Sequence, residues 1–433
     1  MTDALLDYPL LLLGIFLLSG YLASLFFKQF RVPHIVVYLI TGFIIANTLL
    51  REVSIEVELK EWYLLVESLA LGLIGFKIGT ELKFSLIKEH PKFIVVVLLA
   101  EAGGAFLLVF IAVLTLTGNL IITVVLSGLA TATAPAATIE ILRKKKAAGP
   151  LTTRIQWILA FDDVIAITVV EGVLVYLEVS LGGTATALNI LSGLLDEVGI
   201  AVLLGLSVGF AMDIILERMD DELEMMELSL AILVFVMGAA IFLGTSVITA
   251  CMVVGIVSTN RLGDNYAKMS DLLEVVMSPI VMLFFVLVGT RVTFGDFTPF
   301  PVLALVYLMA RSVGKLAGAY GGTKYTGADP VLRNNLGLGL LAQGGVTIGL
   351  VALASDILVE AGETELGHML IATLIISTIF SVILGSIGTT IAVNRSGEAG
   401  KSKIPQRMAH SVIPMDNGEY EVIHNRKKPE GYD

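Results

Sequence analysis

The sequence has few of the residues on which a soluble enzyme relies. Its 433 residues include one cysteine, Cys251, and five histidines, and only 15% of them are charged, whereas a soluble domain usually has about 25%. One cysteine excludes a disulfide framework or a thiolate metal cluster, and the histidines form no close pair of the kind a metal site needs. The net charge of −11 does not suit a nucleic-acid-binding protein. We therefore expect no cofactor and no nucleic-acid partner.

Long apolar runs take the place of the missing charge. Hydrophobic residues make up 56% of the chain, and its mean hydropathy is +0.88. A helix of about 18 apolar residues or more can cross ~30 Å of hydrocarbon, and about thirteen such runs occur. They start near Pro9, Pro33, Trp62, Phe93, Asn119, Ile155, Leu191, Met226, Val247, Leu272, Pro301, Asn334 and Leu366. The sequence therefore predicts an all-α polytopic membrane protein with about 13 transmembrane helices in residues 1–393, surrounded by membrane lipid.

The basic residues of the connections indicate the orientation of the chain. Fifteen lysines and arginines fall in the loops on one side of the predicted helices and three on the other. Because basic loops stay in the cytoplasm, we expect the N-terminus outside and residues 394–433 to form a short, flexible cytoplasmic tail. The segment Met1–Asp7 is acidic, so we expect no cleavable signal peptide. The prediction is an integral protein of the plasma membrane in a prokaryotic cell.

A few charged residues lie in the middle of predicted helices, where each costs about 2.5–3.5 kcal/mol. They are Glu101, Asp162, Asp163, Arg311 and Lys315. Side chains next to each other on a helix point about 100° apart, so one aspartate can face a cavity while the other contacts a basic partner. Burial and a nearby ammonium have opposite effects on proton affinity, which lets a buried aspartate exchange H⁺ for a cation. The alternative is an acidic pair neutralised only for helix packing.

The basic residues of the eleventh run suit two different roles. Lys315 is the natural partner for one aspartate, and because a buried lysine can lose its proton it can also take part in proton exchange. Arg311 stays charged and is expected to be a fixed counter-charge to Glu101. A purely structural pair between Glu101 and Arg311 remains equally open.

Two predicted helices are interrupted. The fifth contains Thr131, Thr133 and Pro135, and proline removes a backbone donor. The twelfth contains Gln343-Gly344-Gly345, a point where the helix can unwind. Irregular backbone is tolerated at membrane depth only where it is buried or lines a cavity. The two breaks are seven helices apart, an odd number that inverts the topology, as inverted-repeat transporters with a midplane ion site require.

These residues resemble the monovalent cation:proton antiporters, in their paired-aspartate (Na⁺/H⁺ exchanger-like) branch. The resemblance rests on Thr131-Ala-Thr-Ala-Pro135, Phe161-Asp-Asp163, Arg311-Ser-Val-Gly-Lys315, the stretch from Leu71 to Leu82 and the glycines near Gly344. It implies a homodimer in which core helices, near 93–177 and 301–393, move against the remaining helices to give alternating access. It also implies that Asp163 binds the cation and protons, that Asp162 pairs with Lys315, and that Thr133 lies near the helix crossing. Many relatives have a basic–Gly–acidic run where this chain has Gln343-Gly-Gly345.

The predicted function is exchange of Na⁺ for H⁺ in pH homeostasis, with K⁺ or Li⁺ as alternative cations. Asp162, Asp163 and Thr133 would hold the transported cation. A K⁺ efflux channel and a sodium-coupled organic anion symporter of the same fold are the rival functions. An intramembrane aspartyl protease needs carboxyl groups from separate segments that share one proton, whereas these two are neighbours on one helix.

Overall fold

The computed structural model describes residues 8–27, 34–48, 60–84, 90–182, 187–219, 221–261, 264–291, 301–402, 412–414 and 420–422. Within these ranges, nine helices are long and apolar enough to cross a membrane. One bent helix pair is long and apolar enough when its two halves are taken together, and three further apolar helices are shorter. Each predicted apolar run corresponds to one of these helices or to an interrupted helix. The all-α polytopic fold is thereby confirmed. Met1–Asp7, on which the expectation about a signal peptide rests, lies outside the described residues.

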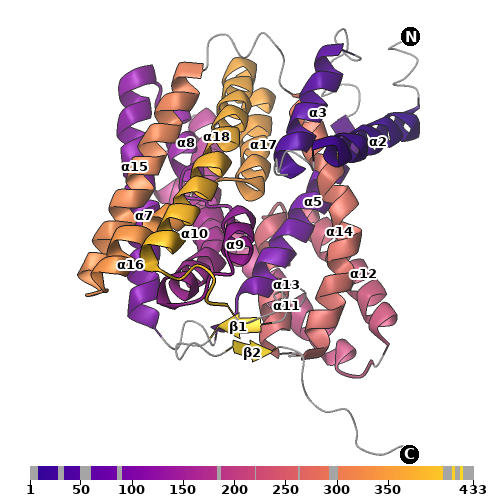
Figure 1. Ribbon diagram of the computed structural model, residues 1–433. Coiled ribbons are helices and arrows are strands. Elements are labelled where there is room, and N and C mark those ends of the chain that lie inside the picture. The colour runs from indigo at the N-terminus through magenta and orange to yellow at the C-terminus, as the bar shows by residue number, and fades with distance from the viewer. Residues whose placement is uncertain are drawn as a thin grey trace, which may run out of the picture.

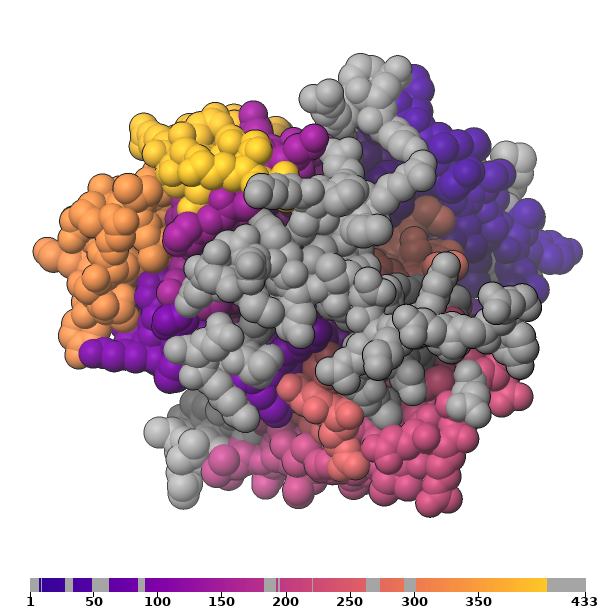
Figure 2. All heavy atoms as spheres, turned by 60° about the horizontal axis from the view of Figure 1, so that its bottom comes forward, coloured from indigo at the N-terminus to yellow at the C-terminus, as the bar shows by residue number. Residues whose placement is uncertain are grey.

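The helices form two groups that contact mainly their own members. The first, which we name the crossing bundle, comprises α7 (Pro91–Thr117), α8 (Leu120–Leu129), α9 (Pro135–Lys144), α10 (Pro150–Leu181), α15 (Pro301–Tyr325), α16 (Pro330–Asn335), η3 (Leu336–Leu340), α17 (Gly345–Glu360) and α18 (Thr364–Ser396). The second, the flanking bundle, comprises α2 (Pro9–Phe27), α3 (His34–Thr48), α5 (Lys60–Glu81), α11 (Ala187–Leu216), α12 (Glu222–Phe242), α13 (Val247–Arg261) and α14 (Asp264–Thr290). Figure 1 shows them on the left and right of the molecule. Figure 2 shows the same division from below, with orange and yellow segments on one side and pink and indigo segments on the other.

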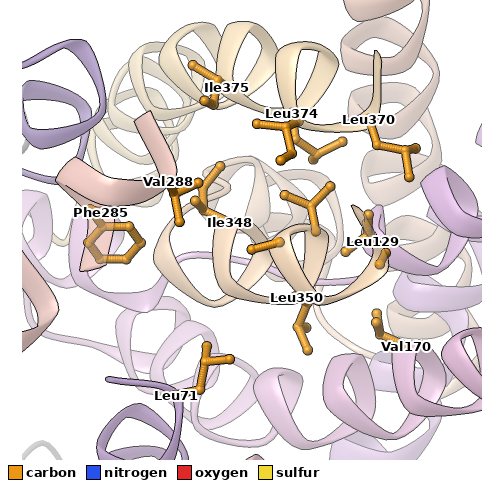
Figure 3. Close-up of a cluster of buried hydrophobic side chains, with 14 of the residues drawn as sticks. Leu71, Leu129, Val170, Phe285, Val288, Ile348, Leu350, Leu370, Leu374 and Ile375 are labelled. Carbon is orange, nitrogen blue, oxygen red and sulfur yellow. The ribbon is translucent and has the colours of Figure 1, made fainter. Parts of the chain in front are cut away.

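An apolar core joins the two bundles. It includes Leu71 of α5 and Phe285 of α14 on one side, and Ile348 of α17 and Leu374 of α18 on the other. Figure 3 shows these side chains gathered around α17. Apolar side chains of both bundles pack against α17, so most residues of this helix are buried.

Helix ends follow ordinary capping chemistry. Helix α7 begins with Pro91 and ends at Gly118, whose φ of 64° lets its N–H reach the carbonyl of Leu114 at 2.9 Å. Proline fits the first turn of a helix because that N–H has no intrahelical partner, and glycine adopts the left-handed cap without strain. These caps limit α7 to one span.

The described part of the tail contains structure that the sequence did not indicate. Strands β1 (Val412–Pro414) and β2 (Tyr420–Val422) pair antiparallel. Closer to α18, the carboxylate of Glu398 accepts hydrogen bonds from the N–H groups of Leu151 and Thr152 at 2.7 and 2.8 Å. A carboxylate at the start of α10 complements both the unpaired N–H groups and the helix dipole. The beginning of the tail is therefore attached to the helix that carries the aspartates.

Two helices of the crossing bundle, α7 and α15, pack backbone against backbone. A Cβ atom added to Gly314 would lie 2.4 Å from the carbonyl oxygen of Gly104, and one added to Gly318 would lie 2.7 Å from the Cα of Glu101. Only glycine permits such an approach. It brings Glu101 of α7 next to Lys315 of α15.

Candidate functional site

The two predicted helix breaks meet in the middle of the crossing bundle. Between α8 and α9, and between η3 and α17, the chain leaves the helix, and the two halves of the second pair are bent by 50°. The N–H of Ala134 donates to the carbonyl of Ala342 at 3.0 Å, and the hydroxyl of Thr138 donates to Gly339 at 2.8 Å. A Cβ atom on Gly344 would lie only 2.8 Å from that of Ala134. The two broken, crossing helices are thus a feature of the fold.

The first break has the residues that the sequence indicated. Pro135 occupies the first turn of α9 and follows the extended residue Ala134. Thr131 donates its hydroxyl to the carbonyl of Gly128 at 2.7 Å and so serves the end of α8. Thr133 is buried and accepts a hydrogen bond from Lys315 at 2.8 Å. The hydroxyl of Thr131 therefore stabilises the backbone at the end of α8, whereas the hydroxyl of Thr133 contacts the charged Lys315.

The second break is held by Gln343. Its side-chain amide donates to the carbonyl of Leu129 at 2.9 Å and to the hydroxyl of Tyr307 at 2.7 Å, and its N–H donates to Ser381 at 3.2 Å. Gly344 and Gly345 lead from this residue into α17. Sequence reasoning did not identify Tyr307, because a tyrosine in an apolar run gives no indication of a polar partner.

Arg311 fills the space between the breaks. It is completely buried, and its guanidinium donates to four backbone carbonyls that the interruptions leave without a helical partner. These are the carbonyls of Leu341 at 2.7 Å, Ala132 at 2.6 Å, Ala130 at 3.2 Å and Ala342 at 3.3 Å. The predicted ion pair between Arg311 and Glu101 is wrong, because Glu101 pairs with Lys315. Five N–H donors in a planar fork suit several fixed carbonyls better than they suit one carboxylate.

Lys315 is the centre of the charged site. It is completely buried, as is Glu101, and Asp162 is 1% exposed. The ammonium nitrogen lies 2.6 Å from Oε2 of Glu101 and 3.4 Å from Oδ1 of Asp162. It also donates to the carbonyl of Thr131. The predicted contact with Asp162 is present, but a carboxylate from another helix lies closer.

Asp163 has different surroundings from its neighbour Asp162. It is 4% exposed, and among the described residues no hydrogen-bond partner reaches its Oδ1. The carboxylates of Asp162 and Glu81 and the ammonium of Lys315 lie within electrostatic range. Glu81, at the end of α5, belongs to the flanking bundle and was not identified as a site residue, although it lies in the Leu71–Leu82 stretch. Oδ1 of Asp163, like Oδ2 of Asp162, is thus a buried carboxylate oxygen without a hydrogen-bond partner among the described residues.

Two further buried clusters join the bundles and were not identified from the sequence. Arg291, the residue that follows α14, makes a two-fold contact with Asp356 of α17 at 2.6 and 3.2 Å. Its guanidinium carbon lies 3.8 Å from the ring centre of Tyr63 in α5. In the other cluster, Glu171 of α10 accepts hydrogen bonds from the hydroxyls of Ser246 and Thr249 beside α13. Arg291 and Asp356 lie near helix ends, where a lone charge is common, so they had no sequence signal. Glu171 lies in the apolar interior of α10 and could have been identified as the two aspartates were.

A membrane protein with two crossed, broken helices and buried charges at their crossing has the architecture of a secondary transporter. The sequence model of the family described as "Sodium/hydrogen exchanger, transmembrane" matches residues 14–395. The chain belongs to this family of integral membrane transporters, and it is not an enzyme.

Solved structures of a sodium proton antiporter have the same fold. One is MjNhaP1 from Methanocaldococcus jannaschii at pH 8, which superposes with a TM-score of 0.74 at 17% sequence identity, covering 91% of this chain and 99% of the other. Another is an electron-microscopy structure of the same antiporter, with a TM-score of 0.70 at 16% identity, covering 89% and 97%. No curated protein sequence matches the chain significantly.

Proposed function

We propose that the protein is a secondary active antiporter that exchanges Na⁺ for H⁺ at the buried pair Asp162 and Asp163. The observation that carries this proposal is Asp163, a buried carboxylate with a free oxygen beside the crossing of two broken helices. Membership of the sodium/hydrogen exchanger family and the likeness to MjNhaP1 support it. K⁺ and Li⁺ are the alternative cations.

Competition for the same oxygens is the proposed mechanism. Carboxylate and hydroxyl oxygens are the donors that hard cations prefer, and Asp163, Asp162 and Thr133 supply them. Protons bind the same carboxylates, so a cation enters only when protons leave. The cation and the protons cannot occupy the site at the same time. Each conformational change therefore carries either the cation or protons across the membrane, and the two fluxes are coupled.

Alternating access is assigned to motion between the bundles. In this proposal the crossing bundle is the moving core, the flanking bundle is the scaffold, and two copies of the chain associate through the scaffold as a homodimer. The division of helix contacts into two groups supports it. The basic loops support an N-terminus outside the plasma membrane of a prokaryotic cell and a C-terminus in the cytoplasm.

Transport by the purified protein in proteoliposomes tests this function. Vesicles with an imposed ΔpH are given Na⁺, K⁺, Li⁺ or choline, with and without a membrane potential. We expect Na⁺ to dissipate the ΔpH and choline to leave it unchanged. Single-channel currents without proton movement would indicate a channel instead. Na⁺-driven uptake of a carboxylate substrate without a pH change would indicate an organic anion symporter.

A further inference from the structure

A histidine and an arginine meet at the end of the crossing bundle where α16 lies in Figure 1. His90 is the N-cap residue of α7, and Arg154 lies near the beginning of α10. The guanidinium Nη2 of Arg154 is 3.2 Å from Nε2 of His90. The orientation proposed above places this end of the bundle in the cytoplasm.

Aromatic rings hold both partners in place. The indole of Trp157 stacks on the imidazole of His90, with the ring centres 5.2 Å apart. The guanidinium carbon of Arg154 lies 4.3 Å from the ring centre of Trp157 and 4.9 Å from that of Phe93. Trp157 is buried. These four side chains therefore form a packed group that joins the beginning of α7 to the beginning of α10.

The contact requires a neutral imidazole. A guanidinium has only donors and keeps its charge, so Nε2 of His90 accepts the hydrogen bond with its lone pair. A proton on Nε2 removes that lone pair and places a second positive charge beside the guanidinium. It also places positive charge at the N-terminus of α7, where the helix dipole disfavours it. Protonation of His90 therefore breaks the contact with Arg154.

The other charged groups around His90 have contacts of their own. His90 and Arg154 line a cavity of about 510 Å³ together with Asp329 and Glu398. The carboxylates of Asp329 and Glu398 attract a proton, but they accept hydrogen bonds from the first N–H groups of α16 and α10. On α7 itself, the ammonium of Lys92 lies over a tyrosine ring. Arg154 is the charged side chain in direct contact with the imidazole.

The two helices that this contact joins also carry carboxylates of the charged site. Glu101 lies eleven residues after His90, and Asp162 lies eight residues after Arg154. At 1.5 Å per residue these separations are about 16 and 12 Å. Both carboxylates contact the ammonium of Lys315. A change in the spacing of α7 and α10 at their beginnings therefore alters the positions of two groups that share one ammonium.

We propose that the contact between His90 and Arg154 is a pH-sensitive switch of the antiporter. When His90 is neutral, the contact joins α7 to α10 and exchange runs at its full rate. When His90 is protonated, the contact opens and the maximal rate falls. Imidazole is the side chain whose charge ordinarily changes between pH 5 and 8, so the switch responds to acidification of the cytoplasm. His90 acts through the helices and is a positioning residue.

The proposal rests on the Na⁺/H⁺ exchange proposed above and adds its regulation. Export of Na⁺ by this exchange brings H⁺ into the cell. A switch that opens at low cytoplasmic pH slows that inward flux when the cytoplasm is already acidic.

The maximal rate at saturating Na⁺ separates this switch from competition at the aspartates, because excess Na⁺ overcomes the competing protons. It is measured in everted membrane vesicles, whose outer face is the cytoplasmic face, from cells without other Na⁺/H⁺ antiporters. Between pH 8 and pH 6 we expect the native rate to fall about fourfold, as does the neutral fraction of an ordinary imidazole. His90→Gln, whose amide oxygen can accept from Arg154 at every pH, should keep a high rate. His34→Gln, the control, changes an exposed histidine of the flanking bundle and should follow the native profile.

Thermal unfolding of the purified protein gives a second measurement that needs no transport. Between pH 8 and pH 6, the unfolding temperature of the native protein should fall more than that of His90→Gln, because only the native contact is lost on protonation. If His90→Gln does not fold, Arg154→Gln takes its place. It removes the charge that repels a protonated His90, so both pH dependences should again be weaker than in the native protein.

The two measurements also distinguish the ways in which the proposal can fail. If the native protein and the folded variant show the same pH dependence of maximal rate and of unfolding temperature, the switch is overturned. A native protein without any Na⁺-dependent ΔpH change contradicts the proposed function instead. In that case the comparison of unfolding temperatures still decides whether protonation of His90 breaks the contact.

Discussion

Gly318 of α15 and Ala100 of α7 are in direct backbone contact: a Cβ atom on Gly318 would lie 2.1 Å from the carbonyl oxygen of Ala100. The contact lies one residue from Glu101 and less than one helical turn from Lys315. The separation of these two helices therefore sets the distance between the glutamate and the lysine on which the site depends.

Gly318→Ala should push α7 and α15 apart. Overpacking of this kind costs about 1–3 kcal/mol, so we expect a lower apparent unfolding temperature in detergent and a slower exchange rate in proteoliposomes. Gly103→Ala and Gly321→Ala are matched controls on the same helices, where an added Cβ meets nothing within 4 Å. A Gly318→Ala protein as stable and as active as these controls would contradict the close contact.

Asp163→Asn should abolish exchange and leave the fold intact. The amide keeps the size of the side chain but can neither bind a cation by charge nor carry the exchanged proton. The measurement is Na⁺-dependent dissipation of ΔpH, together with size-exclusion behaviour and thermal unfolding. Glu171→Gln removes a buried carboxylate from the same helix and should retain exchange. Undiminished Na⁺-dependent dissipation in Asp163→Asn would refute the assignment of the site.

The apparent KM for Na⁺ should fall as pH rises. Protons and Na⁺ compete for Asp162 and Asp163, so a lower proton concentration leaves more carboxylates free for the cation. At low pH the protonated form dominates, and more Na⁺ is needed for half-maximal rate. Initial rates over a range of Na⁺ concentrations at several pH values test this. A KM that stays constant while only the maximal rate changes would argue against competition.

Arg311→Lys should impair both stability and transport, although it keeps the charge. A lysine has one donor group and cannot reach the four carbonyls that the planar guanidinium contacts. Each buried carbonyl that loses its partner costs about 1–3 kcal/mol. Thermal unfolding and exchange rates should both decrease relative to the native protein. If the lysine variant matched it in both, charge rather than geometry would be the function of Arg311.

Arg291→Met should destabilise the junction between the bundles. Arg291 is 6% exposed and contacts Asp356 and the ring of Tyr63. Removal of one member of a buried ion pair leaves the other charge uncompensated, at a cost of about 3 kcal/mol. Lys144→Met is the control, because the Lys144–Glu140 pair is exposed and such pairs contribute at most about 1 kcal/mol. Equal unfolding temperatures for the two variants would contradict this prediction.

The sequence alone predicted the membrane class and the positions of both helix breaks. It predicted about thirteen spans, whereas the described residues contain nine helices long and apolar enough to cross a membrane, one bent helix pair and three shorter apolar helices. Hydropathy, proline and glycine act within a few residues of the chain, so their effects can be read locally. Asp162, Asp163 and Lys315 were singled out for a related reason. A charged residue in an apolar run can be recognised from the sequence without knowledge of the residues it contacts in the fold.

Only the tertiary structure decided which charges meet. Glu101 was expected beside Arg311, yet it pairs with Lys315, while Arg311 binds the carbonyls of the broken helices. Arg291 and Asp356 had no signal at all. Partners from helices far apart in the chain are chosen by helix separation and rotation, here by the glycine contact of α7 with α15, and a pattern along a single helix does not contain that information.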